Sequence, residues 1–258
     1  MIITVEYTSE DVSAFRTIVE AQRNRSDVTQ RLHRNVNGPV PRQDRETLWH
    51  TMFMCLLTSQ QRSGPWSPIS RFLAQDPFPL SLHMCKAGED QQSLIERTIR
   101  EYGGIRFGPK ISELASRNLD YLEAGGWADL EEWVNRLIDQ RLCPPDVDHI
   151  PVEREAARFV QYHLGGFGPK QSRNFWQSLG LTRYEFVLDS RVLKWLREIN
   201  FPIPLSSMAL GSEEYYCFLS EILIDGCLRA EVLPCVWDAA VFASFDKQEW
   251  AVEENRAV

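Results

Sequence analysis

The segment Leu164-Gly165-Gly166-Phe167-Gly168-Pro169-Lys170 separates two stretches of the chain that have helical periodicity. Apolar residues recur at three- and four-residue steps over 152–164 and again over 169–179. The same spacing returns over 189–199, directly after Leu188-Asp189. The pattern predicts a helix, a tight glycine hairpin, a second helix, a short link and a third helix.

The glycine hairpin has the features of a phosphate-binding turn. Gly166 and Gly168 allow the backbone to approach a ligand closely, and the start of the next helix offers unpaired N–H groups to an anion. Pro169 suits the first helical turn, where its missing N–H costs nothing. We therefore expect a phosphate at this hairpin.

Lys170 and Asp189 are the residues in this segment that could carry chemistry. A cation in the first turn of a helix faces the positive end of the helix dipole. If the lysine is partly buried, this place favours the neutral amine, which is a nucleophile. The alternative is an exposed lysine beside an ordinary turn. Asp189 has an alternative role too, as the N-cap of the helix that begins at Ser190.

Taken together, these residues resemble the helix-hairpin-helix (HhH-GPD) DNA glycosylase superfamily, and most closely its lysine-bearing 8-oxoguanine DNA glycosylase/AP lyase branch. Residues 164–170 with Ser172 match the family pattern L-P-G-x-G-x-K-x-A, except that Gly165 replaces the proline. Leu188-Asp189 stands where the family carries its catalytic aspartate, at the family's spacing from the lysine.

The resemblance extends upstream and implies an architecture. Residues 55–61 look like the helix and loop with the family's strand-probing polar residues, and residues 102–110 look like its central glycine turn and helix start. The implied fold is all-α and two-lobed, with an active-site cleft between the lobes. We place the central helical-bundle lobe at 46–144, the second lobe with the helix-hairpin-helix at 1–45 and 145–246, and a loose tail at 247–258.

The resemblance also implies roles for individual residues. Lys170 is the implied nucleophile, which attacks the sugar and forms a Schiff base that β-elimination resolves by cleaving the strand, while Asp189 stabilises positive charge on the sugar. Gln60 or Gln61 fills the gap left by a flipped nucleotide, with capping of a helix C-terminus as the alternative. The implied DNA contacts are Gly165, Gly166, Gly168, Arg191, Gln60 and Gln61.

The excised base is the least defined part of this hypothesis. We expect 8-oxoguanine first, but Asn174 stands four residues after the lysine, where some relatives place a cysteine against the base. Another oxidised purine, or a deliberately modified base such as those of phage DNA, stays open. We place Asn174, Phe218 and Trp237 in the base pocket.

Two further alternatives concern function and the nucleophile. A non-catalytic helix-hairpin-helix module that binds or senses DNA would not need both Lys170 and Asp189. Phe107-Gly108-Pro109-Lys110 repeats the sequence of the hairpin, with Asp129 nineteen residues after Lys110. This turn lacks the tight G-x-G spacing, so Lys110 is the weaker rival nucleophile.

The composition is that of a folded enzyme. A hydrophobic content of 43% and 8 tryptophans in 258 residues exclude a disordered chain, and no apolar run is long enough to cross a membrane. The N-terminus lacks a signal-peptide pattern, so we expect a cytoplasmic protein. We also expect a monomer. The net charge of −8 is unusual for a partner of double-stranded DNA, but basic residues gather locally. These residues are Lys170, Arg173, Arg183, Arg191, Lys194 and Arg197.

The 6 cysteines contain no C-x-x-C pair. Three of them lie near the end of the chain, without the close pair that an iron–sulfur cluster needs. We expect reduced cysteines, no metal and no cofactor.

The periodicity predicts an almost wholly helical chain. One short strand is expected at 2–7, and the polar segment 24–44 is expected to be a loop. Helices are expected at 9–23, 45–59, 66–74, 90–102, 109–124, 128–140, 152–164, 169–179, 189–199, 212–226 and 234–245.

Overall fold

The structure is a computed structural model that describes residues 5–61, 64, 66–87 and 90–246. Within these residues, the regular secondary structure is entirely helical and contains no strand. The prediction of an all-α fold is therefore confirmed. The α-helices are α1 (Ser9–Gln22), α2 (Ser26–Leu32), α3 (Arg45–Leu57), α4 (Pro68–Leu73), α5 (Leu82–Ala87), α6 (Gln91–Tyr102), α7 (Gly108–Tyr121), α8 (Trp127–Leu142), α9 (Ile150–His163), α10 (Pro169–Ser178), α11 (Ser190–Glu198), α12 (Glu213–Arg229) and α13 (Pro234–Phe245).

Several helices begin at capping residues that the sequence displays. Thr8 and Asp11 form a capping box at α1, in which each side chain accepts a hydrogen bond from the other residue's N–H. Asp44, Asp90 and Ser212 cap α3, α6 and α12. In each case the side chain accepts a hydrogen bond from an N–H group in the first turn of the helix. These signals explain why the predicted helix starts agree with the structure to within a few residues.

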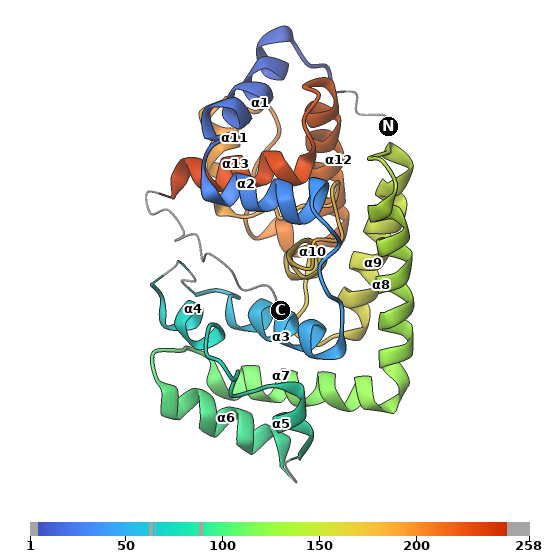
Figure 1. Cartoon of the computed structure of the whole chain (residues 1–258). Helices are drawn as coiled ribbons and strands as arrows, with labels where there is room; N and C mark the ends of the chain where they lie inside the picture. Colours follow the sequence, from blue (N-terminus) through green and yellow to red (C-terminus); the bar gives the residue numbers. More distant parts are fainter. Residues whose placement is uncertain (1–4, 62–63, 65, 88–89, 247–258) are drawn as a thin grey trace.

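The helices form two groups that are visible in Figure 1. Helices α3–α7 lie at one end of the molecule, and α1, α2 and α11–α13 lie at the other. Helix α8 runs along one edge with α9 beside it, and α10 lies between the two groups, in contact with α3 and α9. The hairpin between α9 and α10 therefore lies near the middle of the molecule.

Two large apolar clusters correspond to these groups. The larger includes Trp49 and Phe53 of α3, which is buried on most sides as predicted. It also contains Phe167 and Trp176, so the hairpin and α10 are anchored on α3 and α7. The second cluster joins Phe15 of α1 to α11–α13. Each large side chain buried in these clusters contributes about 1.5–3 kcal/mol to folding. The lobe boundaries drawn from the sequence stay a prediction.

The segment 24–44 is not the loop that the sequence predicted. It contains α2 and a π-helical stretch over His33–Asn37. Only Val28 is buried within α2, and it packs with apolar side chains of α13. A short polar helix of this kind depends on a distant partner, which periodicity does not reveal.

Helix α5 is a second element that the sequence analysis missed. The Glu46 carboxylate accepts hydrogen bonds from the N–H groups of Leu82 (2.8 Å) and His83 (2.9 Å). The first turn of α5 is thus capped from α3, more than thirty positions away. A cap supplied by another helix leaves no local sequence signal.

The predicted strand at 2–7 is wrong for its described part, because residues 5–7 have no regular structure and residues 1–4 lie outside the described range. The predicted tail at 247–258 also lies outside the described residues. In the described part of the chain, no helix has the length and apolar character needed to span a bilayer.

Candidate active site

The predicted hairpin is present between α9 and α10. Helix α9 ends at His163, and α10 begins at Pro169 with Gly168 as its N-cap. Gly166 has a φ of +87°, and a Cβ atom there would lie 2.7 Å from Leu56 Cδ2 and 3.0 Å from a methyl carbon of Leu114. Only glycine fits this position without strain, because the turn is left-handed and presses against α3 and α7.

The hairpin is fixed to α7 by one buried amide. Asn118 Oδ1 accepts a hydrogen bond from the Gly165 N–H (2.6 Å), and Asn118 Nδ2 donates to the Gly165 carbonyl (3.1 Å). Asn118 occupies the same buried face as Ile111 and Ala115, a polar residue in a core register that sequence reasoning passed over. The Gly165 N–H is therefore already bonded, whereas the exposed backbone of Gly166 and Gly168 faces solvent.

Lys170 lies in the first turn of α10 and its side chain is exposed. Among the described residues it forms no hydrogen bond or ion pair. Its charge acts on Cys55 of α3. Burial raises the pKa of the Cys55 thiol, whereas the Asn174 hydrogen bond and the Lys170 charge oppose that rise. The amine therefore lies by the junction of α10 and α3.

Lys110, the rival nucleophile, lies in a different environment. Its ammonium group donates to both carboxylate oxygens of Glu113, at 3.0 and 3.2 Å, in an i,i+3 ion pair on the surface of α7. This ion pair with a carboxylate one turn away occupies the ammonium group, so it is less available to a substrate. The comparison supports Lys170 as the free amine.

Asp189 is the N-cap of α11. Its Oδ1 atom accepts hydrogen bonds from the N–H groups of Arg191 (2.8 Å) and Val192 (3.2 Å), and its Oδ2 atom lies 3.2 Å from Arg191 Nη1. The capping role is therefore real, and the side chain keeps 15% of its surface exposed. No hydrogen bond or ion pair joins Asp189 to Lys170 in the described residues, so any joint action would pass through a ligand between them.

Asp238 is an acidic neighbour of Asp189 that the sequence analysis did not single out. It accepts hydrogen bonds from Arg31 Nη1 and Gln177 Nε2, each at 3.1 Å. Burial raises the Asp238 pKa to about 6; the Arg31 charge opposes this rise, and the Asp189 charge adds to it. Through Gln177, this carboxylate connects α13 to the C-terminal half of α10.

Arg191, which we expected to contact DNA, is already held by two contacts within the protein. Besides its ion pair with Asp189, its guanidinium lies over the Phe242 ring at 4.1 Å from the centroid. The side chain keeps 37% of its surface exposed. A contact with DNA phosphate would therefore use the exposed edge of a guanidinium that is already oriented.

Gln60 and Gln61 have different roles in the structure. Gln61 Nε2 donates to the Leu57 carbonyl at the end of α3 (2.6 Å), and its Oε1 accepts from the Arg106 N–H (2.9 Å). This is the capping role that the sequence left open. Gln60 is exposed, with a φ of +56°, and remains the glutamine that is available to DNA.

The three expected base-pocket residues are not equivalent. Trp237 is fully buried, with its ring against Phe15 and Phe186, so it cannot line a surface pocket and we withdraw it. Phe218 is half-buried on α12 and stays a prediction. Asn174 is half-buried one turn after Lys170, where its Nδ2 donates to Gln171 Oε1 at 3.2 Å.

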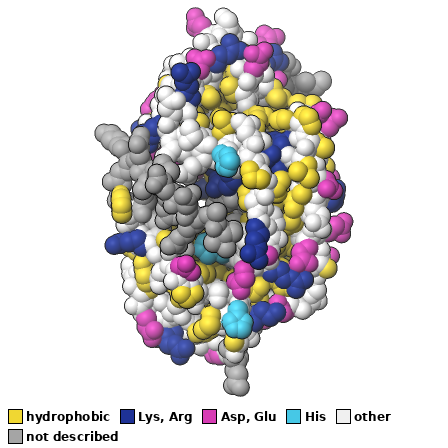
Figure 2. Space-filling view, in the orientation of Figure 1, with side chains coloured by type: hydrophobic (Ala, Val, Ile, Leu, Met, Phe, Trp, Pro, Cys, Tyr) yellow, Lys and Arg dark blue, Asp and Glu magenta, His cyan; other side chains and the backbone are white. Residues whose placement is uncertain are grey.

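The expected cluster of basic residues is only partly on the surface. Arg173 is 0% exposed and Arg183 is 3% exposed, so neither can contact DNA. Arg183 donates to the Arg141 carbonyl and to the Cys143 carbonyl (2.8 Å) at the end of α8. On the face shown in Figure 2, basic and acidic side chains are interspersed rather than separated.

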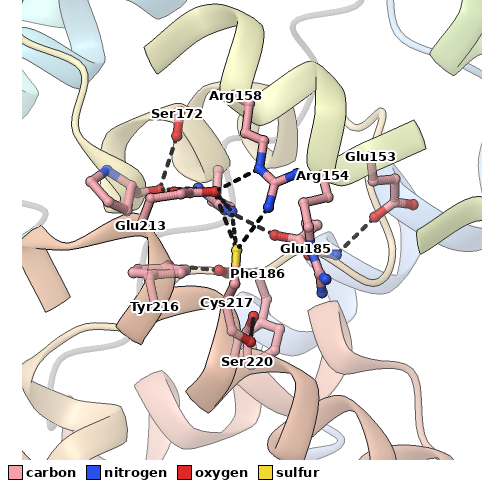
Figure 3. A network of polar contacts seen from close by, with 12 residues as sticks. Glu153, Arg154, Arg158, Ser172, Glu185, Phe186, Glu213, Tyr216, Cys217 and Ser220 are labelled. Atoms are coloured by element: carbon pink, nitrogen blue, oxygen red, sulfur yellow. Dashed lines mark hydrogen bonds and ion pairs between the residues drawn. The ribbon is translucent and has the colours of Figure 1, made fainter. Parts of the chain in front are cut away.

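A buried ionic network that includes Arg154, Glu185 and Glu213 lies beside the hairpin (Figure 3). Arg173 joins this network through both carboxylates. Its Nε donates to Glu185 Oε2 (2.9 Å), and its two terminal nitrogens donate to Glu213 at 2.7 Å each. Burial opposes the Arg173 charge, but these carboxylates outweigh it and raise the arginine pKa. Arg154 donates to the other Glu185 oxygen (2.9 Å).

None of the cysteines is paired in the structure, and Cys143 is the exposed one. Within the described residues, no group of three or more His, Cys, Asp or Glu side chains is arranged to hold a metal ion.

Comparison with known proteins identifies the fold. A scan of family models and a search of curated proteins found no match. The solved 8-oxoguanine DNA glycosylase of Methanocaldococcus jannaschii matches with a TM-score of 0.63 and 14% identity, over 93% of this chain and 97% of that one. Tm1821, the 8-oxoguanine DNA glycosylase of Thermotoga maritima, matches with a TM-score of 0.61 and 18% identity, over 94% and 99%. The chain therefore has the helical fold of these glycosylases, and at such identities the likeness shows the fold alone.

Proposed function

We propose that the protein is a DNA glycosylase with AP lyase activity, which removes a damaged or modified base from double-stranded DNA through Lys170. The observation that carries this proposal is the unpaired Lys170 amine in the first turn of α10, directly after the glycine hairpin. The likeness in fold to two 8-oxoguanine DNA glycosylases supports it.

DNA binding is assigned to the hairpin and the start of α10. The exposed backbone of Gly166 and Gly168 lies at a helix N-terminus, where N–H groups and the helix dipole favour a phosphate. On α11, Arg197 is exposed and adds positive charge, and Lys194 is exposed but lies 3.9 Å from Glu198 Oε1. Because these contacts are made to phosphates, we expect DNA binding to weaken as the salt concentration rises.

Base excision begins when the target nucleotide leaves the helix stack, which costs a few kcal/mol. The neutral Lys170 amine attacks C1′ of the sugar, and the bond between C1′ and the base breaks. The base leaves with that electron pair and takes up a proton. Loss of a proton from nitrogen and opening of the sugar ring then give an imine between Lys170 and C1′.

Strand cleavage follows because the protonated imine withdraws electrons from the neighbouring carbon. Protonated imine nitrogen acidifies the hydrogens on C2′, so a base can remove one of them. The electron pair then forms a double bond between C2′ and C3′, and the bond from C3′ to the phosphate oxygen breaks. Water finally hydrolyses the imine and returns Lys170 as the free amine.

Asp189 is assigned to the charge that develops on the sugar. As the base departs, positive charge builds at C1′ and the ring oxygen, and a nearby carboxylate stabilises it. Its two capping bonds and its ion pair with Arg191 hold the carboxylate in one orientation. Such fixed groups stabilise a transition state without reorganisation.

Duplexes with defined lesions test this function directly. We expect single-turnover release of a base from at least one member of a panel that includes 8-oxoguanine, other oxidised purines and phage-type modified bases. Strand cleavage should accompany base release. Binding of lesion and undamaged duplexes without any base release would instead favour a non-catalytic helix-hairpin-helix module.

A further inference from the structure

The link between α10 and α11 is largely buried although it has no helix or strand. Buried backbone groups in such a segment need hydrogen-bond partners from elsewhere. In the first half of the link, the Glu153 carboxylate accepts hydrogen bonds from three consecutive N–H groups, those of residues 183–185, at 2.8–2.9 Å. Helix α9 thereby fixes the start of the link.

One phenol fixes the end of the link, immediately before Asp189. The Tyr216 hydroxyl accepts a hydrogen bond from the Leu188 N–H (2.7 Å) and donates to the Phe186 carbonyl (2.9 Å). Burial raises the Tyr216 pKa, which keeps the hydroxyl protonated and able to do both. Figure 3 shows Tyr216 directed at Phe186 from α12.

Arg173 joins this phenol to the start of α10. Its Nη1 atom donates to the Pro169 carbonyl (3.3 Å), next to Lys170 in the sequence. Its guanidinium lies over the Tyr216 ring, 4.8 Å from the centroid, and also binds Glu185 of the link. A continuous set of contacts therefore runs from the residue before Lys170 to the residue before Asp189.

The charges of this network compensate one another. Arg154, Arg158 and Arg173 pair with Glu185, Glu213 and Glu221. A balanced and mostly buried network has no excess charge with which to attract DNA or another ion. Its effect is instead to hold α9, α10, α12 and the link in one arrangement.

We propose that Arg173 and Tyr216 are positioning residues that set the place of Asp189 relative to Lys170. This inference rests on the proposed function. Both side chains are fully buried, so they act through the backbone on either side of the two catalytic residues and not on the DNA. An error of about 1 Å in such a geometry costs on the order of 100-fold in rate.

Removal of one hydroxyl tests the proposal. Tyr216→Phe keeps the ring beneath Arg173 but leaves the Leu188 N–H and the Phe186 carbonyl without their partner. We expect single-turnover base excision to fall by about tenfold or more, with DNA affinity within twofold of wild type. Borohydride trapping on a duplex with a preformed abasic site should fall less, because attack on an aldehyde does not need charge stabilisation during base departure.

Tyr215→Phe is the matched control on the same helix. The Tyr215 hydroxyl donates to the Pro204 carbonyl (2.6 Å), away from the link. We expect this variant to keep the wild-type excision rate. A purely structural role for Tyr216 would lower the melting temperature but leave the excision rate of the folded protein unchanged.

The outcomes separate the two proposals. A wild-type protein that neither excises a base nor forms an adduct overturns the proposed function and this inference with it. An active wild type with a Tyr216→Phe rate within twofold of that of Tyr215→Phe overturns only the positioning role. If Tyr216→Phe does not fold, Glu185→Gln takes its place, since it weakens the Arg173 contact with the same link and should slow excision without loss of DNA affinity.

Discussion

The chain contains the sequence Phe-Gly-Pro-Lys twice, at the start of α7 and at the start of α10, and the two copies have different surroundings. Phe107 is 44% exposed with a left-handed backbone, whereas Phe167 is buried against Phe175. Gly108 is buried, and a Cβ atom there would lie 3.3 Å from Ile99, whereas Gly168 has open space around it.

The two lysines differ accordingly. Lys110 forms an ion pair with Glu113 of its own helix, whereas Lys170 has no such partner among the described residues. The residue three positions after each lysine explains this contrast, because it is Glu113 in the first copy and Arg173 in the second. Gly165 and Gly166 add a second difference, since they fasten the second turn to α7 and α3. The same four residues thus form an ordinary helix start in one place and an open, anchored turn in the other.

The largest expected effect separates the two lysines. Lys170→Gln should abolish strand cleavage of a lesion duplex, because an amide cannot form an imine, while DNA affinity stays close to wild type. Lys110→Gln should leave cleavage unchanged. Gel assays of cleavage and binding on the same duplex measure both properties. The opposite pattern would transfer the nucleophile to the α7 turn.

Asp189→Asn has the next largest expected effect. Asparagine caps a helix about as well as aspartate, so the melting temperature should change little. Loss of the negative charge should slow base excision by about 10²–10³-fold. Asp44→Asn at the cap of α3 is the matched control, with no expected change in rate. Single-turnover kinetics that place both variants within a few-fold of wild type would reduce Asp189 to a capping residue.

A substitution in the hairpin should have a smaller and less selective effect. Gly166→Ala places a Cβ atom against Leu56 at a positive φ, which should weaken binding to every duplex by about tenfold through a lost or misplaced phosphate contact. Gly211→Ala, at an exposed glycine outside the hairpin where a Cβ atom meets open space, is the control and should bind normally. Fluorescence titrations with lesion and undamaged duplexes distinguish this from a base-pocket role, which would affect only one lesion.

The buried link after α10 should make the stability of the protein depend on pH, through the Glu153 carboxyl group that binds its backbone. Burial raises the Glu153 pKa from its usual 4.5 to about 7, so the folded state holds this proton more tightly than the unfolded state. Its contribution to stability is therefore present below about pH 4.5 and is lost as pH rises through 7. At about 1.4 kcal/mol per pKa unit, this loss amounts to about 3 kcal/mol.

Urea unfolding of Glu153→Gln across this range measures the effect. The variant should lack that decline with pH, and the surface variant Glu113→Gln should keep it. A wild-type stability that rises between pH 5 and 7.5 relative to Glu153→Gln would contradict the assignment.

Most of this site could be predicted because its signals are local. Helical periodicity and capping residues placed α9, α10 and α11, and the glycine spacing placed the hairpin between them. The positions of Lys170 and Asp189 at two helix starts follow from the same short-range rules. Local rules also allowed two roles for Asp189, and the structure shows one of them, the N-cap of α11.

The parts that escaped prediction depend on contacts between distant segments. Arg173 looked like a surface cation in the sequence, but Glu213, forty residues away, makes its burial possible. Trp237 looked available for a base, yet α1 and the link cover it. Asn118 and Glu153 did leave a trace, since each is a polar residue in the buried register of its helix. That trace marks a buried polar contact but cannot name its partner.

The most direct test of the central claim is to locate the covalent adduct. Wild-type protein is reduced with borohydride on a duplex that carries an abasic site, then digested, and the modified peptide is sequenced by mass spectrometry. We predict a single adduct on Lys170, the amine without an ion pair after the hairpin. An adduct on Lys110, or no adduct from a protein that releases bases, would contradict the claim that Lys170 is the nucleophile.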